Sequence, residues 1–172
     1  MIRILAFLGG LSGAVGLSQF PEFSQQYLQR LAGSVDELRG FVLDFDSSAS
    51  KAGLTREDAL EEISGSSFLN QHQADTAHKI ERYEQLNANY VALKEAEPLQ
   101  RLSQVYRFTD TDLARRTWDD FRPAVPVTLD GFICAAIGFG AIWLIIRLVF
   151  GGLGRVFRRR QIADTEPQAL DL

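Results

Sequence analysis

The chain has 172 residues and a formal net charge of −4, which leaves room for one domain, with or without membrane anchors, and excludes a large multidomain enzyme. One cysteine and two histidines exclude an intramolecular disulfide framework and leave little for a zinc site. Hydrophobic residues make up 46% of the chain, but they are concentrated near its two ends, so the average composition hides the organisation.

The first apolar segment, residues 4–20, contains no charged side chain. As a helix it would be about 26 Å long, at the short limit for crossing a hydrocarbon core of about 30 Å. We predict an N-terminal transmembrane helix over 1–20. Gly9 and Gly13, together with Gly16, would give it a small-residue face for packing against another membrane helix.

A cleaved secretory signal is the alternative for this segment. Arg3, the apolar run and the small pair Ala14 and Gly16 fit the pattern of a signal peptide and its cleavage site. Cleavage would leave a periplasmic protein with one C-terminal anchor. The glycine spacing favours the retained helix.

The second apolar segment, residues 129–150, carries only two charged side chains, Asp130 and Arg147, both near its ends. As a helix it would be about 33 Å long, which is enough to cross a bilayer. We predict a C-terminal transmembrane helix over 129–153, with Ala136 and Gly140 as its helix-packing face; Cys134 and Gly138 have the same spacing.

The middle segment, 21–128, has helical periodicity throughout. Two apolar stripes predict a helix from 21 to about 48 and a helix over 68–96, with a short helix after Thr55 between them. The first stripe consists of Phe23, Tyr27, Leu31, Val35, Leu38, Val42 and Phe45, and the second of Ala77, Ile80, Tyr83, Leu86 or Asn87, Tyr90 and Leu93. Shorter helices are expected over 99–108 and after Asp110, and Thr128 can cap the second membrane helix. We expect an all-α membrane protein in which two transmembrane helices flank an extracytoplasmic helical hairpin.

Basic residues set the expected topology. They follow the second span closely, at Arg147, Arg155, Arg158, Arg159 and Arg160. Because basic flanks stay in the cytoplasm, the tail 154–172 is expected there, in contact with anionic lipid through its basic part. Two spans then place the N-terminus in the cytoplasm as well and the hairpin 21–128 outside the cytoplasm.

Motifs that carry chemistry are missing from the sequence. Nucleophile-elbow, P-loop, dinucleotide and zinc-protease patterns do not occur, so we expect no enzyme and no cofactor. A calcium loop starting at Asp44 fails because Ala49 and Thr55 occupy its glycine and glutamate positions. His72 and His78 do not share a helix face, so no metal site is predicted.

Five segments, 18–31, 36–38, 52–57, 82–84 and 120–124, resemble in the same order an uncharacterised family of proteobacterial inner-membrane proteins, domain of unknown function 2937. The first segment, SQFPEFSQQYLQRL, is the most specific. The resemblance implies a Gram-negative inner membrane, a periplasmic helical region and a retained first span. It implies no activity, ligand or catalytic residue.

Together these patterns favour a structural, assembly or accessory subunit that acts through helix–helix interactions. The expected partners are the lipid bilayer and either a second copy or another inner-membrane protein, with no nucleic acid. The alternative is an oligomeric channel or transport component, because two spans per subunit could line a pore as a ring.

Overall fold

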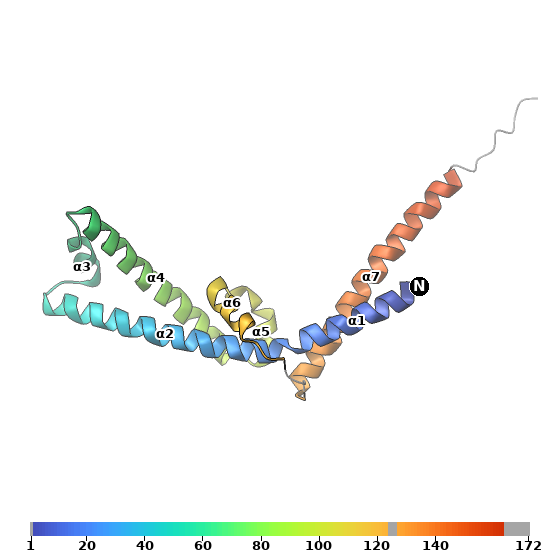
Figure 1. The fold of residues 1–172 in the computed structure, drawn as a ribbon, viewed down its shortest axis with the longest axis horizontal. Helices are drawn as coiled ribbons and strands as arrows, with labels where there is room; N and C mark the ends of the chain where they lie inside the picture. Colours follow the sequence, from blue (N-terminus) through green and yellow to red (C-terminus); the bar gives the residue numbers. More distant parts are fainter. Residues whose placement is uncertain (1, 124–126, 164–172) are drawn as a thin grey trace, which may run out of the picture. The chain divides into compact units, whose positions relative to one another are not determined.

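The computed structural model of the protein describes the backbone of residues 2–123 and 127–163 and the side chains of 2–123 and 127–150. Every regular element in these ranges is a helix, in agreement with the predicted all-α class (Figure 1). The elements are α1 (Ile2–Ser18), α2 (Phe20–Lys51), α3 (Arg56–Glu62), α4 (Ser67–Glu95), α5 (Pro98–Ser103), the 3-10 helix η1 (Val105–Arg107), α6 (Thr111–Asp119) and α7 (Leu129–Ala163).

The chain divides into two compact units. The two ends of the chain form one, which contains α1 and α7, and Glu22–Pro123 forms the other. We call α1 and α7 the helix pair and Glu22–Pro123 the central unit. The structure describes each unit by itself.

The helix pair contains the two stretches that are long and apolar enough to cross a membrane. One lies in the helical stretch Ile2–Lys51, which is interrupted at Gln19, and the other is Leu129–Phe150; their mean hydropathies are 1.4 and 2.3. Only 17% and 11% of these apolar windows is buried, whereas the core helix of a soluble protein is mostly buried. Two apolar helices therefore suggest a membrane location.

Helix α7 extends further than the predicted span. It begins at Leu129, where the hydroxyl of Thr128 accepts a hydrogen bond from the Gly131 amide at 3.2 Å, as expected for an N-cap. It continues past Phe150 to Ala163. Arginine and glutamine are good helix formers, so the basic segment can prolong the helix.

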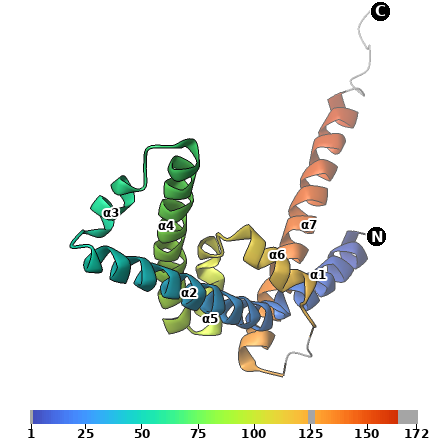
Figure 2. The same ribbon diagram turned by 60° about the vertical axis from the view of Figure 1, so that its left-hand side comes forward.

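The central unit is built on two long helices. Helices α2 and α4 run in opposite directions, with α3 across one end and α5, η1 and α6 packed at the other (Figures 1 and 2). The two long helices lie closest near α5 and diverge towards α3. The core cluster comes from α2, α4 and α6 and consists of Tyr27, Leu28, Leu31, Val35, Leu86, Leu93 and Leu113.

The predicted stripes agree with this core at most positions. On α2 the expected Tyr27, Leu31, Val35 and Val42 are all buried. On α4 the expected Ala77 is exposed, and the neighbouring Thr76 is buried in its place. Thr76 can lie on the buried face because its hydroxyl donates to the His72 carbonyl at 2.8 Å, so no polar group is left without a partner.

The end of α2 differs from the prediction. The sequence suggested a stop near Ser48, but the helix continues to Lys51. Ser48 donates its hydroxyl to the Asp44 carbonyl within the helix, at 2.9 Å, and does not break it. The stop comes at Gly53, whose φ of +78° suits glycine, and the Leu54 amide donates back to the Ala49 carbonyl at 2.9 Å in a Schellman motif.

Helices α3, α4 and α6 each begin after a residue whose side chain caps the first turn. Thr55 accepts from the Asp58 amide and Asp110 accepts from the Leu113 amide, as predicted, and Ser66 accepts from the Leu69 amide. The single helix expected over 99–108 is instead divided into α5 and η1, with Gln104 between them.

Candidate functional site, a glycine-lined helix pair

The two helices of the pair approach closely where α1 carries glycines. A Cβ added at Gly13 would lie 2.5 Å from the carbonyl oxygen of Gly138, and one added at Gly138 would lie closer still to the carbonyl oxygen of Gly13. Real Cβ contacts are not this short, so the two backbones touch in a way that only glycine permits.

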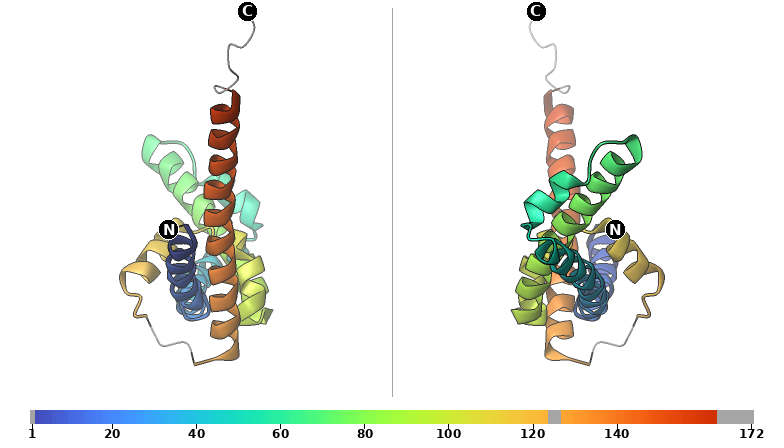
Figure 3. Two further views of the ribbon diagram at one scale, coloured as in Figure 1. Left: turned by 90° about the vertical axis from the view of Figure 1, so that its right-hand side faces the viewer. Right: turned by 90° about the vertical axis from the view of Figure 1, so that its left-hand side faces the viewer.

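The contact continues towards the N-terminus of α1. A Cβ at Gly9 would clash with the Ile146 side chain, and one at Gly10 would lie 2.8 Å from the Phe139 ring. Residue numbers rise along α1 as they fall along α7, so the pair is antiparallel; the two helices lie side by side in Figures 1 and 3. The rings of Phe7 and Phe139 add an edge-to-face contact, with centroids 5.8 Å apart.

The structure brings together some of the glycines that the sequence singled out and leaves others apart. Gly9 and Gly13 lie in the contact, whereas a Cβ at Gly16 or Gly140 would meet nothing within 4 Å. Ala136 is exposed. The buried face of α7 instead carries Cys134 and Gly138, which lie two positions away and therefore on a different side of the helix.

Arg147 lies at the far end of the second apolar span from Thr128. Its guanidinium lies over the Trp143 ring, 4.7 Å from the ring centroid, a cation–π arrangement on the exposed side of the helix. No charged residue occurs on α7 between Asp130 and Arg147. Arg155, Arg158, Arg159 and Arg160 follow on α7, but their side chains are outside the described part of the chain.

The central unit has polar side chains but no cluster suited to a metal. No group of three His, Cys, Asp or Glu side chains within the described ranges could hold an ion. His72 stacks on Phe68, with centroids 6.4 Å apart, and His78 lines a surface hollow of about 400 Å³ with Lys79 and Arg116. Both histidines are exposed.

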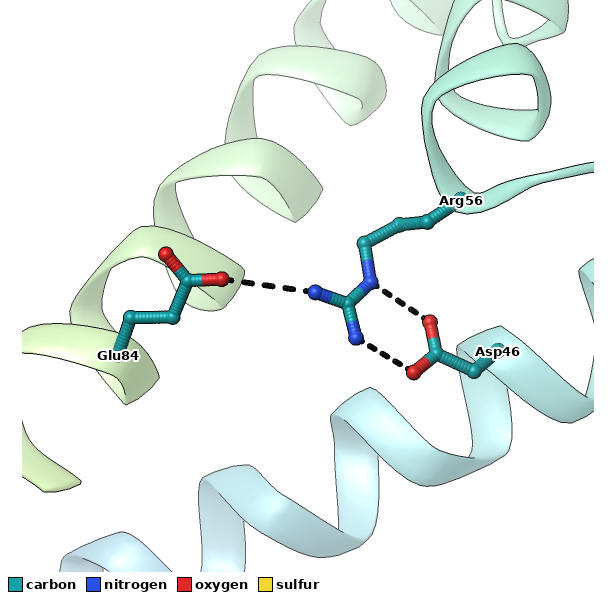
Figure 4. Close-up of polar contacts among 3 residues, drawn as sticks. All are labelled: Asp46, Arg56 and Glu84. Carbon is teal, nitrogen blue, oxygen red and sulfur yellow. Dashed lines mark hydrogen bonds and ion pairs between the residues drawn. The ribbon is translucent and has the colours of Figure 1, made fainter.

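Arg56, at the start of α3, joins α2 to α4 (Figure 4). Its Nε and Nη2 donate to the two carboxylate oxygens of Asp46 at 2.7 and 2.5 Å, and its Nη1 lies 3.5 Å from a Glu84 oxygen. The hydrogen bonds from Arg56 hold the pKa of Asp46 below its usual value, and the same bonds raise the pKa of Arg56. This bidentate pair fixes α3 across the diverging ends of the two long helices.

Arg101, on α5, makes polar contacts at the opposite end of the central unit. It is buried, and its Nε donates to the carbonyls of Leu93 and Ala96 at 2.9 and 3.1 Å while its Nη1 donates to Gln25 on α2 at 2.9 Å. The side chain thus satisfies carbonyls at the end of α4, which would otherwise have no partner in the helix. Burial lowers the pKa of Arg101.

Tyr27 lies in the core of the central unit, towards the end that contains Arg101. Its ring contacts Phe108, with centroids 4.5 Å apart, and its hydroxyl oxygen is buried with no hydrogen-bond partner of acceptable geometry among the described residues. Burial, and secondarily the negative charge of Asp110, raises the pKa of Tyr27 to about 12, although a contact of the hydroxyl with the Asp110 backbone partly offsets the rise.

Sequence reasoning missed Arg101 and Gly10 as packing residues. Arg101 follows Pro98 in a short segment with no distinctive pattern, and only the return of α5 beneath α4 brings it to the carbonyls. Gly10 lies in the same contact as Gly9 and Gly13, but it does not belong to the four-residue spacing of those two glycines, so that pattern did not single it out.

A comparison with known protein families assigns the chain to a family. A family model described as a protein of unknown function, DUF2937, matches residues 1–159, which include both apolar helices and the whole central unit. No curated protein and no solved structure matched the chain. The protein belongs to the DUF2937 family, as its sequence segments suggested.

Proposed function

We propose that this protein crosses the bacterial inner membrane twice, with both termini in the cytoplasm and the central unit in the periplasm. The antiparallel contact of α1 and α7 supports two spans that return the chain to the side where it began. The basic residues after the second span support a cytoplasmic C-terminus.

The first span is retained in this proposal. Cleavage near Gly16 would remove Gly9, Gly10 and Gly13 and leave the face of α7 around Gly138 without the surface that covers it. The intact mass of the protein purified from membranes tests this directly. We expect a mass that includes α1, whereas a mass lacking the first segment would establish a cleaved signal and a single C-terminal anchor.

We propose further that the protein is a structural, assembly or accessory subunit and not an enzyme. The observation that carries this proposal is the set of large apolar side chains that the central unit leaves exposed on several elements. Apart from Trp118, they are Leu43, Phe68, Leu69, Val91, Val105 and Tyr106. A water-facing unit that exposes so many apolar side chains is suited to docking on another protein.

Crosslinking in cells, followed by purification in mild detergent, tests this role. We expect a specific crosslinked species, either a second copy or another membrane protein, that weakens when Phe68 and Tyr106 are replaced by serine. Glu57→Ser, an exposed change without apolar loss, serves as the control. A monomer with no crosslinked or co-purifying protein would contradict the proposal.

An oligomeric channel is the competing function. The segment of α7 between Asp130 and Arg147 offers no charged side chain to line a pore, so we place this alternative second. Ion flux through purified oligomeric protein in lipid vesicles would favour it, and the absence of flux from such vesicles would remove it.

A further inference from the structure

Three aromatic rings gather at one end of the central unit. Phe23, in the first turns of α2, lies 6.2 Å from Trp118 and 5.9 Å from Phe121 between ring centroids, both edge to face. Trp118 and Phe121 stack on each other at 6.2 Å. We call these three residues the aromatic triad. Trp118 is 69% exposed although it is the largest side chain of the group.

Contacts within the central unit hold the backbone on either side of Trp118 in place. Arg30 on α2 forms an ion pair with Asp120, which lies between Trp118 and Phe121 in the sequence. Thr117, directly before Trp118, is buried and donates its hydroxyl to the Leu113 carbonyl at 2.7 Å. The Trp118 indole therefore extends from a helix that is anchored to the central unit, and not from a loop.

The triad lies close in sequence to both apolar helices. Phe23 follows Ser18, the last residue of α1, by five positions, or about 8 Å at the helical rise. The headgroup region on each side of a bilayer is about 5–8 Å thick. Phe121 precedes Leu129, the first residue of α7, by eight positions, so both connections to the apolar helices leave the central unit close to these rings.

The chemistry of the triad fits this depth. Tryptophan is enriched where lipid headgroups meet the hydrocarbon, because its ring is apolar and its indole N–H can reach water or a headgroup oxygen. The exposed Arg122 follows directly and can pair with lipid phosphate. An exposed tryptophan on a rigid aromatic platform is otherwise costly in water.

We propose that the aromatic triad is a membrane-interface anchor, whose partner is the headgroup–acyl boundary of the lipid bilayer. Trp118 inserts among the headgroups, and Phe23 and Phe121 support it from the protein side. The anchor fixes how the central unit stands on the membrane, beyond the two covalent connections. It rests on the proposed membrane insertion of α1 and α7.

Tryptophan fluorescence tests the anchor, because the chain contains two tryptophans, Trp118 and Trp143. The full-length Trp143→Phe variant, reconstituted in vesicles, leaves Trp118 as the only indole. We expect its emission to be shifted to the blue, protected from acrylamide in water, and quenched more strongly by a nitroxide on the lipid headgroup than by one deep on the acyl chain. Emission as in water, with full acrylamide quenching and no lipid quenching, would overturn the proposal.

Two matched variants distinguish a failure of the anchor from a failure of the proposed membrane insertion of α1 and α7. Trp118→Phe leaves Trp143, which should be quenched by acyl-chain nitroxide; if it is not, the membrane span itself fails. Glu57→Trp in a chain without other tryptophans reports an exposed position on α3, outside the proposed docking surface, and should show the water-like behaviour. If Trp143 is lipid-quenched while Trp118 behaves like the position 57 indole, only the anchor is refuted.

Discussion

The helix pair and the central unit are both made of helices, but they are held together in opposite ways. In the helix pair the backbones of Gly13 and Gly138 touch, and small residues form the contact. In the central unit, large side chains such as Tyr27, Leu31 and Leu93 fill the space between α2 and α4. Arginine side chains form the polar contacts at the two ends of these two helices.

The proposed membrane location of the helix pair, with the central unit in water, accounts for this difference. In water, burial of large apolar side chains drives helices together, at roughly 25 cal/mol per Å². In lipid that driving force is missing, so close approach through glycine and the resulting van der Waals contact must replace it. The two units should therefore fail through different kinds of substitution.

The largest expected effect is the loss of the glycine contact. Gly138→Leu places a side chain against the carbonyl oxygen of Gly13, which cannot move as a flexible side chain could. We expect about 3 kcal/mol less stability for the helix pair. The free energy of unfolding in mild detergent, followed by Trp143 fluorescence, measures this.

Gly140→Leu is the control for that prediction, because it meets nothing within 4 Å. It should change stability by less than about 0.5 kcal/mol. Equal losses in both variants would show that the close approach of α1 and α7 does not hold the pair together.

The second effect breaks the central unit through a polar group. Arg101→Met removes the donor from the carbonyls of Leu93 and Ala96 and from Gln25. We expect a loss of about 2 kcal/mol, because buried carbonyls lose their partner. Thermal unfolding followed by Trp118 fluorescence reports it.

Arg115→Met provides the comparison, since that side chain is exposed and its nearest carboxylate, on Asp119, is 3.8 Å away. It should be nearly neutral. If the two variants melt alike, Arg101 does not hold α4 and α5 together.

A smaller effect concerns the pair of Asp46 and Arg56. Asp46→Asn should cost about 1 kcal/mol or less at pH 7, because the pair is partly exposed. The folded protein lowers the pKa of Asp46, so the stabilisation is present above the usual value of 3.8 and is lost as the pH falls through the lower, folded value. Denaturation of both proteins at neutral and acidic pH should show curves that converge in acid; a constant gap would contradict the assignment.

The smallest effect belongs to the Tyr27 hydroxyl. Because this buried oxygen lacks a good partner, Tyr27→Phe should be neutral or stabilising by less than about 1 kcal/mol. The pKa of Tyr27 is raised from 10.0 to about 12, so the wild type should lose stability as the pH rises through this interval and the variant should lose less. Alkaline unfolding of both proteins checks the difference, and a clear destabilisation of the variant at pH 7 would show that the hydroxyl is satisfied.

Helix positions in the central unit could be predicted because water imposes an amphipathic pattern. The stripe through Tyr27, Leu31 and Val35 marks the buried face, and Thr55 and Asp110 mark helix starts. The end of α2 was placed too early because Ser48 resembled a stop, whereas the left-handed turn at Gly53 provides it.

The packing face of the helix pair was harder to predict for the same physical reason. Helix α7 carries no charged side chain on any face between Asp130 and Arg147, so nothing distinguishes Ala136 and Gly140 from Cys134 and Gly138 until the partner helix is placed. The aromatic triad and Arg101 also depend on elements far apart in the sequence. Local patterns do not contain those contacts.

Reporter fusions at Met1, Ser66 and Leu172 test the central claim, that both apolar helices cross the membrane and return the chain to its starting side. Each position would carry a reporter that is active only in the cytoplasm or one that is active only in the periplasm. The account predicts cytoplasmic activity at Met1 and Leu172 and periplasmic activity at Ser66. The same activity at all three positions, or opposite activities at Met1 and Leu172, would contradict it.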